Sequence, residues 1–207
     1  MTSIRAFIKK IIGNHSFITV VSGFPRSGTS MMMSALQAGG MPLLIDRIRG
    51  ADANNPKGYY EFERVKQLPK GDIRWLKDAR GKAIKIISAL LTFLPPDYNY
   101  RVIFMERDLD EIMASQQRML ARSGKPPQSE QDTQTIRATS QQHLDEIRSW
   151  LTAKEWIQTH TVSYNDILRF PEDQFAEVAA FLDDRVDPES MASVVDPVLY
   201  REKKNDT

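Results

Sequence analysis

The hydrophobic residues of this chain gather in short runs that are separated by longer polar stretches. Residues 18–22 form the first run, and residues 100–105 form another in which apolar and polar positions do not alternate. Runs of this length without a polar face predict strands that are covered on both sides, as in a parallel sheet. Further strands are expected at residues 82–87 and 156–162, and a strand or an extended segment at residues 41–45.

Amphipathic or helix-favouring stretches lie between these runs. They are expected at residues 29–36, 64–80, 135–151 and 171–182, with a further helix beginning near Asp108 and Asp110. Pro69 and Gly71 would divide the second of these stretches into two pieces. Strands that alternate with helices predict an α/β fold, here a three-layer α/β/α domain with a central, mainly parallel sheet over residues 1–207.

The composition limits the classes of function. The 207 residues are 41% hydrophobic and 27% charged, with a net charge of +1, no cysteine, and three histidines without metal-ligand spacing. A nucleic-acid partner, a disulfide and a metal site are therefore not expected. No apolar run approaches the roughly 20 residues of a membrane span, so a cytoplasmic protein is expected. Residues 1–13 would form a short amphipathic helix, against the body or, less expectedly, on a membrane surface.

The stretch with the clearest chemical meaning is the turn that follows the first strand. Residues 23–30 read Gly-Phe-Pro-Arg-Ser-Gly-Thr-Ser and lead directly into a predicted helix. A glycine-framed turn at a helix start directs backbone N–H groups and the positive end of the helix dipole at one point, which suits an anion. The stretch nearly fits the P-loop pattern of nucleotide-binding proteins, but Thr29 stands at the position of the P-loop lysine. The alternative is a strand, turn and helix without a ligand.

This turn resembles the 5′-phosphosulfate loop of the sulfotransferases, which reads Pro-(Lys/Arg)-Ser-Gly-Thr-(Thr/Ser). The resemblance implies that the loop binds the sulfuryl donor 3′-phosphoadenylyl sulfate (PAPS). The residues implied in binding are Arg26, Ser27, Gly28, Thr29 and Ser30.

A second stretch of the same resemblance follows the strand at residues 100–105. In sulfotransferases a strand that ends in Arg, an acidic helix start and a Ser eight residues after that Arg hold the 3′-phosphate of PAPS. Arg107 and Ser115 have this spacing here. The alternative is that Arg107 is an ordinary strand-end arginine in a salt bridge. Two motifs in the family's order are more specific than either alone.

Two further matches are weaker. Ser163-Tyr164-Asn165-Asp166-Ile167-Leu168 resembles the family's Tyr-Glu-Asp-Leu segment, which implies that Tyr164 contacts the adenine, although Asn165 replaces the usual Glu. A Tyr that is simply buried against the next helix is the alternative. Near the C-terminus, Arg201 stands where many family members close over the nucleotide, but a solvated basic tail explains it equally well.

The resemblance implies transfer of a sulfuryl group from PAPS to a hydroxyl or amine of a small-molecule acceptor. Arg26 and Lys85 would stabilise the charge that develops, and no metal is required. Lys85 stands where the family has the lysine of a Lys-x-His pattern, whose histidine is the base. This chain has Ile87 at the position of that histidine. A carboxylate is therefore the expected base: Glu61 first, with Glu63 and Asp46 as alternatives.

Two other functions stay open at this point. A P-loop nucleotide kinase or NTPase is weakened by the missing lysine, and a non-catalytic module that binds PAPS or its product PAP is kept open by Ile87. The sequence leaves the acceptor and the oligomeric state open.

Overall fold

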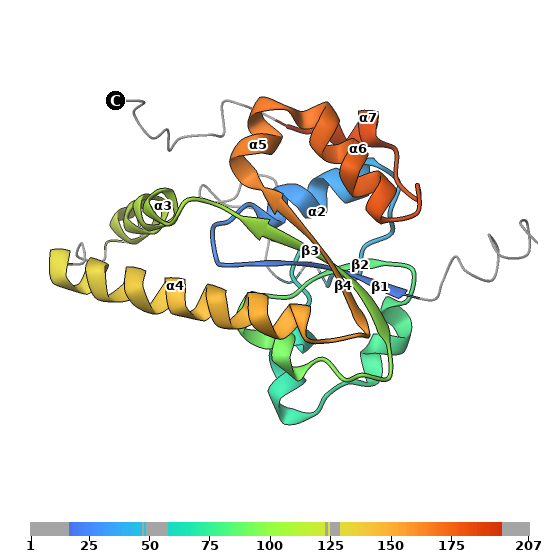
Figure 1. Cartoon of the computed structure of the whole chain (residues 1–207), viewed down its shortest axis with the longest axis horizontal. Helices are drawn as coiled ribbons and strands as arrows, with labels where there is room; N and C mark the ends of the chain where they lie inside the picture. The colour runs from blue at the N-terminus through green and yellow to red at the C-terminus, as the bar shows by residue number, and fades with distance from the viewer. Residues whose placement is uncertain (1–16, 47, 49–57, 123, 125–128, 196–207) are drawn as a thin grey trace, which may run out of the picture.

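A twisted, four-stranded sheet in which every pairing is parallel forms the centre of the fold, in the order β2-β1-β3-β4 (Figure 1). The computed structural model describes residues 17–46, 48, 58–122, 124 and 129–195. The strands are β1 (Phe17–Gly23), β2 (Ala83–Lys85), β3 (Asn99–Glu106) and β4 (Ile157–Ser163). The predicted α/β fold with a parallel sheet is confirmed.

The two long strands β1 and β3 send alternate side chains into two separate hydrophobic cores. Ile18, Val20 and Val102 face one core, whereas Val21 and Ile103 face the other. All of these side chains are fully buried. Burial on both faces explains why these strands read as continuous apolar runs in the sequence.

Helices cover both faces of the sheet (Figure 1). On one face lie α2 (Thr29–Ala38), α5 (Tyr164–Arg169), α6 (Pro171–Phe181) and α7 (Pro188–Ala192). On the other lie α4 (Glu130–Thr152) and the 3₁₀ helices η2 (Glu63–Lys70), η3 (Arg74–Ala79) and η4 (Ser88–Phe93). Helix α3 (Leu109–Arg122) follows β3 and packs against α4. The predicted three layers are therefore present.

For two segments, 41–45 and 64–80, the structure decides between forms that the sequence left open. Residues 41–45 form no strand of the sheet but an extended segment with a single parallel bridge, between Leu43 and Ala83. Residues 64–80 form two 3₁₀ helices rather than α-helices, and Gly71 caps the first of them with φ 81°. Pro69 lies inside this first helix, where it has no N–H to donate to an α-helical ladder.

Two predictions fall outside the described residues, namely those for residues 1–13 and for Arg201. Within the part of the chain that the structure describes, no helix has the length and apolarity needed to cross a membrane.

Candidate active site

The turn between β1 and α2 has the backbone geometry of an anion cradle. Gly28 begins α2 in the left-handed conformation, with φ 99°. A Cβ atom at Gly28 would lie 2.4 Å from Cδ2 of Tyr164, so both the backbone conformation and the neighbouring ring require glycine there. Arg26 also adopts a positive φ, of 75°, which is uncommon for a residue with a side chain. Strained residues of this kind are often held at functional sites.

Hydrogen-bond donors of this turn are available to a ligand. No side chain among the described residues caps the first turn of α2, which also contains no acidic residue. The hydroxyl of Ser27, a residue only 1% exposed, has no hydrogen-bond partner among the residues that the structure describes. Because buried polar groups almost always have a partner, an anionic ligand seated on the turn would satisfy this hydroxyl and the amides of the helix start.

The structure brings Arg26, Arg107 and Ser115 together from three different elements. Nε of Arg26 donates to Oγ of Ser115 over 2.9 Å, and Nη1 of Arg107 donates to the carbonyl oxygen of Arg26 over 3.3 Å. Burial lowers the pKa of the Arg26 guanidinium from its ordinary value, and the positive charge of Arg107 adds to this lowering. The Arg107 guanidinium therefore lies against the backbone of Arg26 and close enough for its charge to act on the Arg26 side chain, an arrangement that favours an anion at this place.

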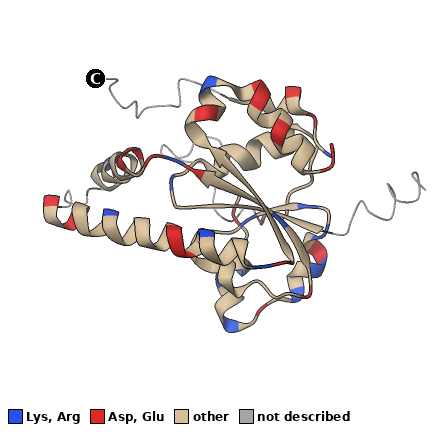
Figure 2. Cartoon of the chain, in the orientation of Figure 1, with Lys and Arg blue, Asp and Glu red and all other residues tan. Residues whose placement is uncertain are grey.

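Acidic and basic residues are otherwise interspersed over the described elements (Figure 2). With a net charge of +1 for the whole chain, the positive potential at the loop is local. A local field of this kind suits a small anionic ligand rather than an extended polyanion.

Arg107 forms the salt bridge that the alternative interpretation of the sequence allowed, within a buried network whose partners the sequence analysis did not name. Its Nε donates to Oε2 of Glu111 over 2.9 Å, and Oε1 of Glu111 accepts from Nδ2 of Asn165, also over 2.9 Å. The ring of Tyr164 lies 4.4 Å from the guanidinium carbon of Arg107. The spacing of four residues between Arg107 and Glu111 at a helix start is the one signal by which the sequence could have indicated this ion pair.

Tyr164 is buried in the hydrophobic core on the α2 side of the sheet. Its ring contacts Arg107, and it closes against the position of Gly28. Burial raises the pKa of its phenol, so the hydroxyl stays protonated. Contact of Tyr164 with an adenine stays a prediction.

A second cluster of polar side chains lies on the other side of the loop, at the end of β2. Nζ of Lys85 donates to the carbonyl oxygen of Tyr59, lies 3.5 Å from Oγ of Ser30, and lies 3.9 Å from Oε1 of Glu61. The Lys85 and Glu61 side chains are 9% and 23% exposed, respectively. The structure therefore places Lys85 beside Ser30 of the loop and Glu61 beside Lys85.

The two other candidate carboxylates have local structural partners. Glu63 forms a salt bridge of 2.7 Å with Lys66 on the exposed side of η2. Oδ2 of Asp46 accepts a hydrogen bond of 2.6 Å from the backbone N–H of Glu63 at the start of η2. These contacts show that both acids support the 3₁₀ helix η2. Of the three candidate carboxylates, Glu61 is the one that lies beside Lys85 of β2.

A histidine of another element lies beside the residue that follows Ile87. Ile87 is 46% exposed, and the hydroxyl of the next residue, Ser88, lies 2.9 Å from Nε2 of His143 on α4. The ring of His143 lies 6.3 Å from the ring of Phe24 in the loop. Because Ser88 and His143 are 55 positions apart, the sequence contained no signal for this contact.

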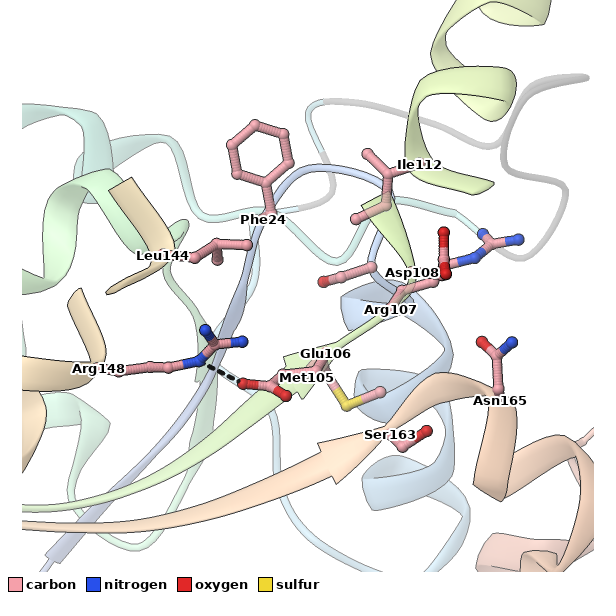
Figure 3. Close-up of a pocket in the computed structure, with 11 residues that line it drawn as sticks. Phe24, Met105, Glu106, Arg107, Asp108, Ile112, Leu144, Arg148, Ser163 and Asn165 are labelled. Atoms are coloured by element: carbon pink, nitrogen blue, oxygen red, sulfur yellow. Dashed lines mark hydrogen bonds and ion pairs between the residues drawn. The ribbon is translucent and has the colours of Figure 1, made fainter. Parts of the chain in front are cut away.

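A cavity of about 370 Å³ opens at the carboxyl ends of β1, β3 and β4. Figure 3 shows Leu144 and Arg148 reaching toward it from α4 and Asn165 on the opposite side. Arg148 forms a salt bridge of 2.8 Å with Glu106 at this rim. The lining combines loop residues, the strand-end arginine and apolar side chains, including Phe24, Ser27, Arg107 and Ile112. Ligands of parallel α/β sheets bind at this edge. Among the described residues, no cluster of three or more His, Cys, Asp or Glu side chains could hold a metal ion.

Sequence comparison identifies the family. Residues 58–188, well over half of the chain, match the model of the sulfotransferase family. The chain belongs to the sulfotransferase family. The match begins after the loop at residues 23–30, so the loop motif of this sulfotransferase is an observation independent of the family assignment.

Structural comparison finds a similar fold in a solved structure. The sulfotransferase is similar to the sulfotransferase domain from the curacin biosynthetic pathway, with a TM-score of 0.50 and 17% identity, over 90% of this chain and 86% of that one. At this identity the likeness concerns the fold alone. The comparison with curated proteins gave no match.

Proposed function

We propose that this sulfotransferase transfers the sulfuryl group of PAPS to a hydroxyl or amine of a small acceptor. The observation that carries the proposal is the convergence of Arg26, Arg107 and Ser115 beside the uncapped start of α2. This arrangement would offer two neighbouring anion positions, one on the loop and one at the end of β3. PAPS carries anionic groups at its 5′ and 3′ positions, and so matches both.

The loop residues fit the 5′-phosphosulfate of PAPS. The buried Ser27 hydroxyl, which has no partner among the described residues, and the amides at Gly28, Thr29 and Ser30 would donate to its oxygens. Arg107 and Ser115 would hold the 3′-phosphate, and the cavity lined by Phe24 and Asn165 has room for part of the nucleoside. Arg201 lies outside the described residues, and its closure over the nucleotide stays part of the proposal.

The reaction needs a base for the acceptor and fixed positive charge for the leaving phosphate. PAPS supplies the sulfuryl group. Glu61 would accept the acceptor's proton at a carboxylate oxygen while the acceptor oxygen or nitrogen bonds to sulfur and the bond from sulfur to the phosphate oxygen breaks, which leaves PAP. Lys85 and Arg26 would stabilise the negative charge that develops at the loop. The 3.9 Å contact between Lys85 and Glu61 supports the placement of base and cation on the same side of the loop.

The role of Arg107 gives the first prediction. PAP is expected to bind at least about ten-fold more tightly than ADP, because its 3′-phosphate gains charge-assisted contacts of about 1.5–3 kcal/mol each from Arg107 and Ser115. Arg107→Ala is expected to remove most of this preference. Calorimetric titration of both proteins with both nucleotides measures it, and equal affinity of the wild-type protein for PAP and ADP contradicts the proposal.

A further inference from the structure

Glu111 and Asn165 hold Arg107 in a way that the proposed reaction does not itself explain. The Arg107 and Glu111 side chains are only 7% and 4% exposed. An ion pair removed from water in this way is stabilising only when its geometry is good and its remaining polar atoms are bonded. Glu111 meets this condition because each carboxylate oxygen accepts one hydrogen bond, from Arg107 and from Asn165.

These contacts fix the orientation of the Arg107 guanidinium. Glu111 accepts a hydrogen bond from its Nε, and the carbonyl oxygen of Arg26 accepts one from its Nη1. The guanidinium carbon lies 4.4 Å from the centre of the Tyr164 ring. Two nitrogens of this planar group are hydrogen-bonded and an aromatic ring lies beside it, so the guanidinium has little freedom to rotate. The direction in which its N–H groups meet an anion is therefore set by Glu111 and its supports.

The pairing also explains why position 165 carries an amide. Asn165 Nδ2 donates to Glu111 Oε1, and a carboxylate at position 165 would instead place a second negative charge 2.9 Å from the first. Two like charges at that distance in a buried site repel strongly. An acid at 111 therefore requires a neutral donor at 165.

We propose that Glu111 and Asn165 are a pair of positioning residues that orient Arg107, and that through Arg107 they set the preference of the site for a 3′-phosphorylated nucleotide. This inference rests on the proposed function, because it assigns the 3′-phosphate to Arg107. The pair carries one negative charge in total. Arg107 is oriented when one carboxylate faces one amide, and either position can carry either group.

A swap of isosteric side chains tests the pair. Glu111→Gln removes the charge, Asn165→Asp adds a second one, and the double variant restores one carboxylate facing one amide. We expect each single variant to lower the ratio of ADP to PAP dissociation constants by about ten-fold, as for loss of one charge-assisted contact. The double variant is expected to recover the ratio to within about three-fold of wild type.

The ratio separates orientation from folding, because partial unfolding weakens PAP and ADP binding equally. Asp110→Asn is the matched control: Asp110 is the adjacent acid on α3 but is 54% exposed and pairs with Arg137, so its loss should leave the ratio unchanged. Thermal unfolding of every variant is measured in parallel. If Glu111→Gln does not fold, Asn165→Ala, which only removes the donor, is expected to lower the ratio about three-fold.

The outcomes are distinct. A wild-type protein that binds PAP and ADP equally overturns the proposed function itself. A wild-type preference that Arg107→Ala removes but the Glu111 and Asn165 variants keep, with only their melting temperatures changed, overturns the positioning role alone. If the single variants lose the preference and the double variant does not recover it, the claim that positions 111 and 165 can exchange the carboxylate and the amide is overturned.

Discussion

Replacing Glu61 with Gln is expected to lower kcat by roughly 10²–10⁴, with PAP affinity nearly unchanged. Gln keeps the shape of the side chain but cannot accept the acceptor's proton. Glu61 lies 3.9 Å from Lys85, which in turn lies 3.5 Å from the loop hydroxyl of Ser30, so its carboxylate lies by the loop without belonging to the nucleotide contacts proposed above. Transfer of labelled sulfate to a competent acceptor measures kcat, and titration with PAP measures affinity.

Glu63→Gln is the matched control for this experiment. Glu63 is two residues away, carries the same group and pairs with Lys66 at the surface, so its loss is expected to leave kcat within about two-fold, as for an exposed ion pair. Full activity of Glu61→Gln removes Glu61 from the mechanism. A collapse of kcat in Glu63→Gln moves the base two residues along the chain.

Replacing Arg26 with Ala is expected to lower turnover by about 10²–10³ while PAP binding stays within a few-fold, as for loss of a donor that acts in the transition state. Arg26 adopts φ 75°, and Ala also carries a Cβ atom, so the substitution does not change the strain of this backbone conformation as Gly would. Arg107 donates to the backbone carbonyl of Arg26, a contact that the substitution does not remove chemically.

Single-turnover rates at saturating PAPS and direct PAP titration separate the two possible roles of Arg26. Its side chain donates to Ser115 in the structure, so a role in holding the nucleotide is the competing explanation. Loss of PAP binding in Arg26→Ala, with unchanged turnover per bound complex, identifies Arg26 as a ground-state anchor and contradicts its role in the transition state.

The fold could be predicted from the sequence largely because its strands are buried on both faces. Residues 18–22 and 100–105 read as continuous apolar runs for that reason, and both are strands of the sheet. The segment at residues 41–45 is also apolar, but it is only partly buried and makes only one bridge, between Leu43 and Ala83. An apolar run predicts contact with the core, but it does not show whether the segment pairs with a neighbouring strand.

The site could be predicted only where its residues belong to local motifs. The loop and the pair Arg107 and Ser115 have fixed spacings, and the structure brings them together. The contact of Asn165 with Glu111 joins residues 54 positions apart, and that of Ser88 with His143 joins residues 55 apart. Such contacts depend on how α3, α4 and α5 pack on the sheet, which a local pattern does not encode. The sequence thus showed that Asn165 departs from the family motif but not that Glu111 faces it.

Titration of the wild-type protein with PAP and, separately, with ATP and Mg²⁺ tests the central claim most directly. A site built for a 3′-phosphorylated nucleotide at Arg107 and Ser115, with Thr29 in place of the P-loop lysine, should bind PAP saturably and at least about ten-fold more tightly than ATP with Mg²⁺. PAP affinity should be the same in the presence of EDTA. Tighter binding of ATP with Mg²⁺ than of PAP would contradict the assignment of this site to PAPS.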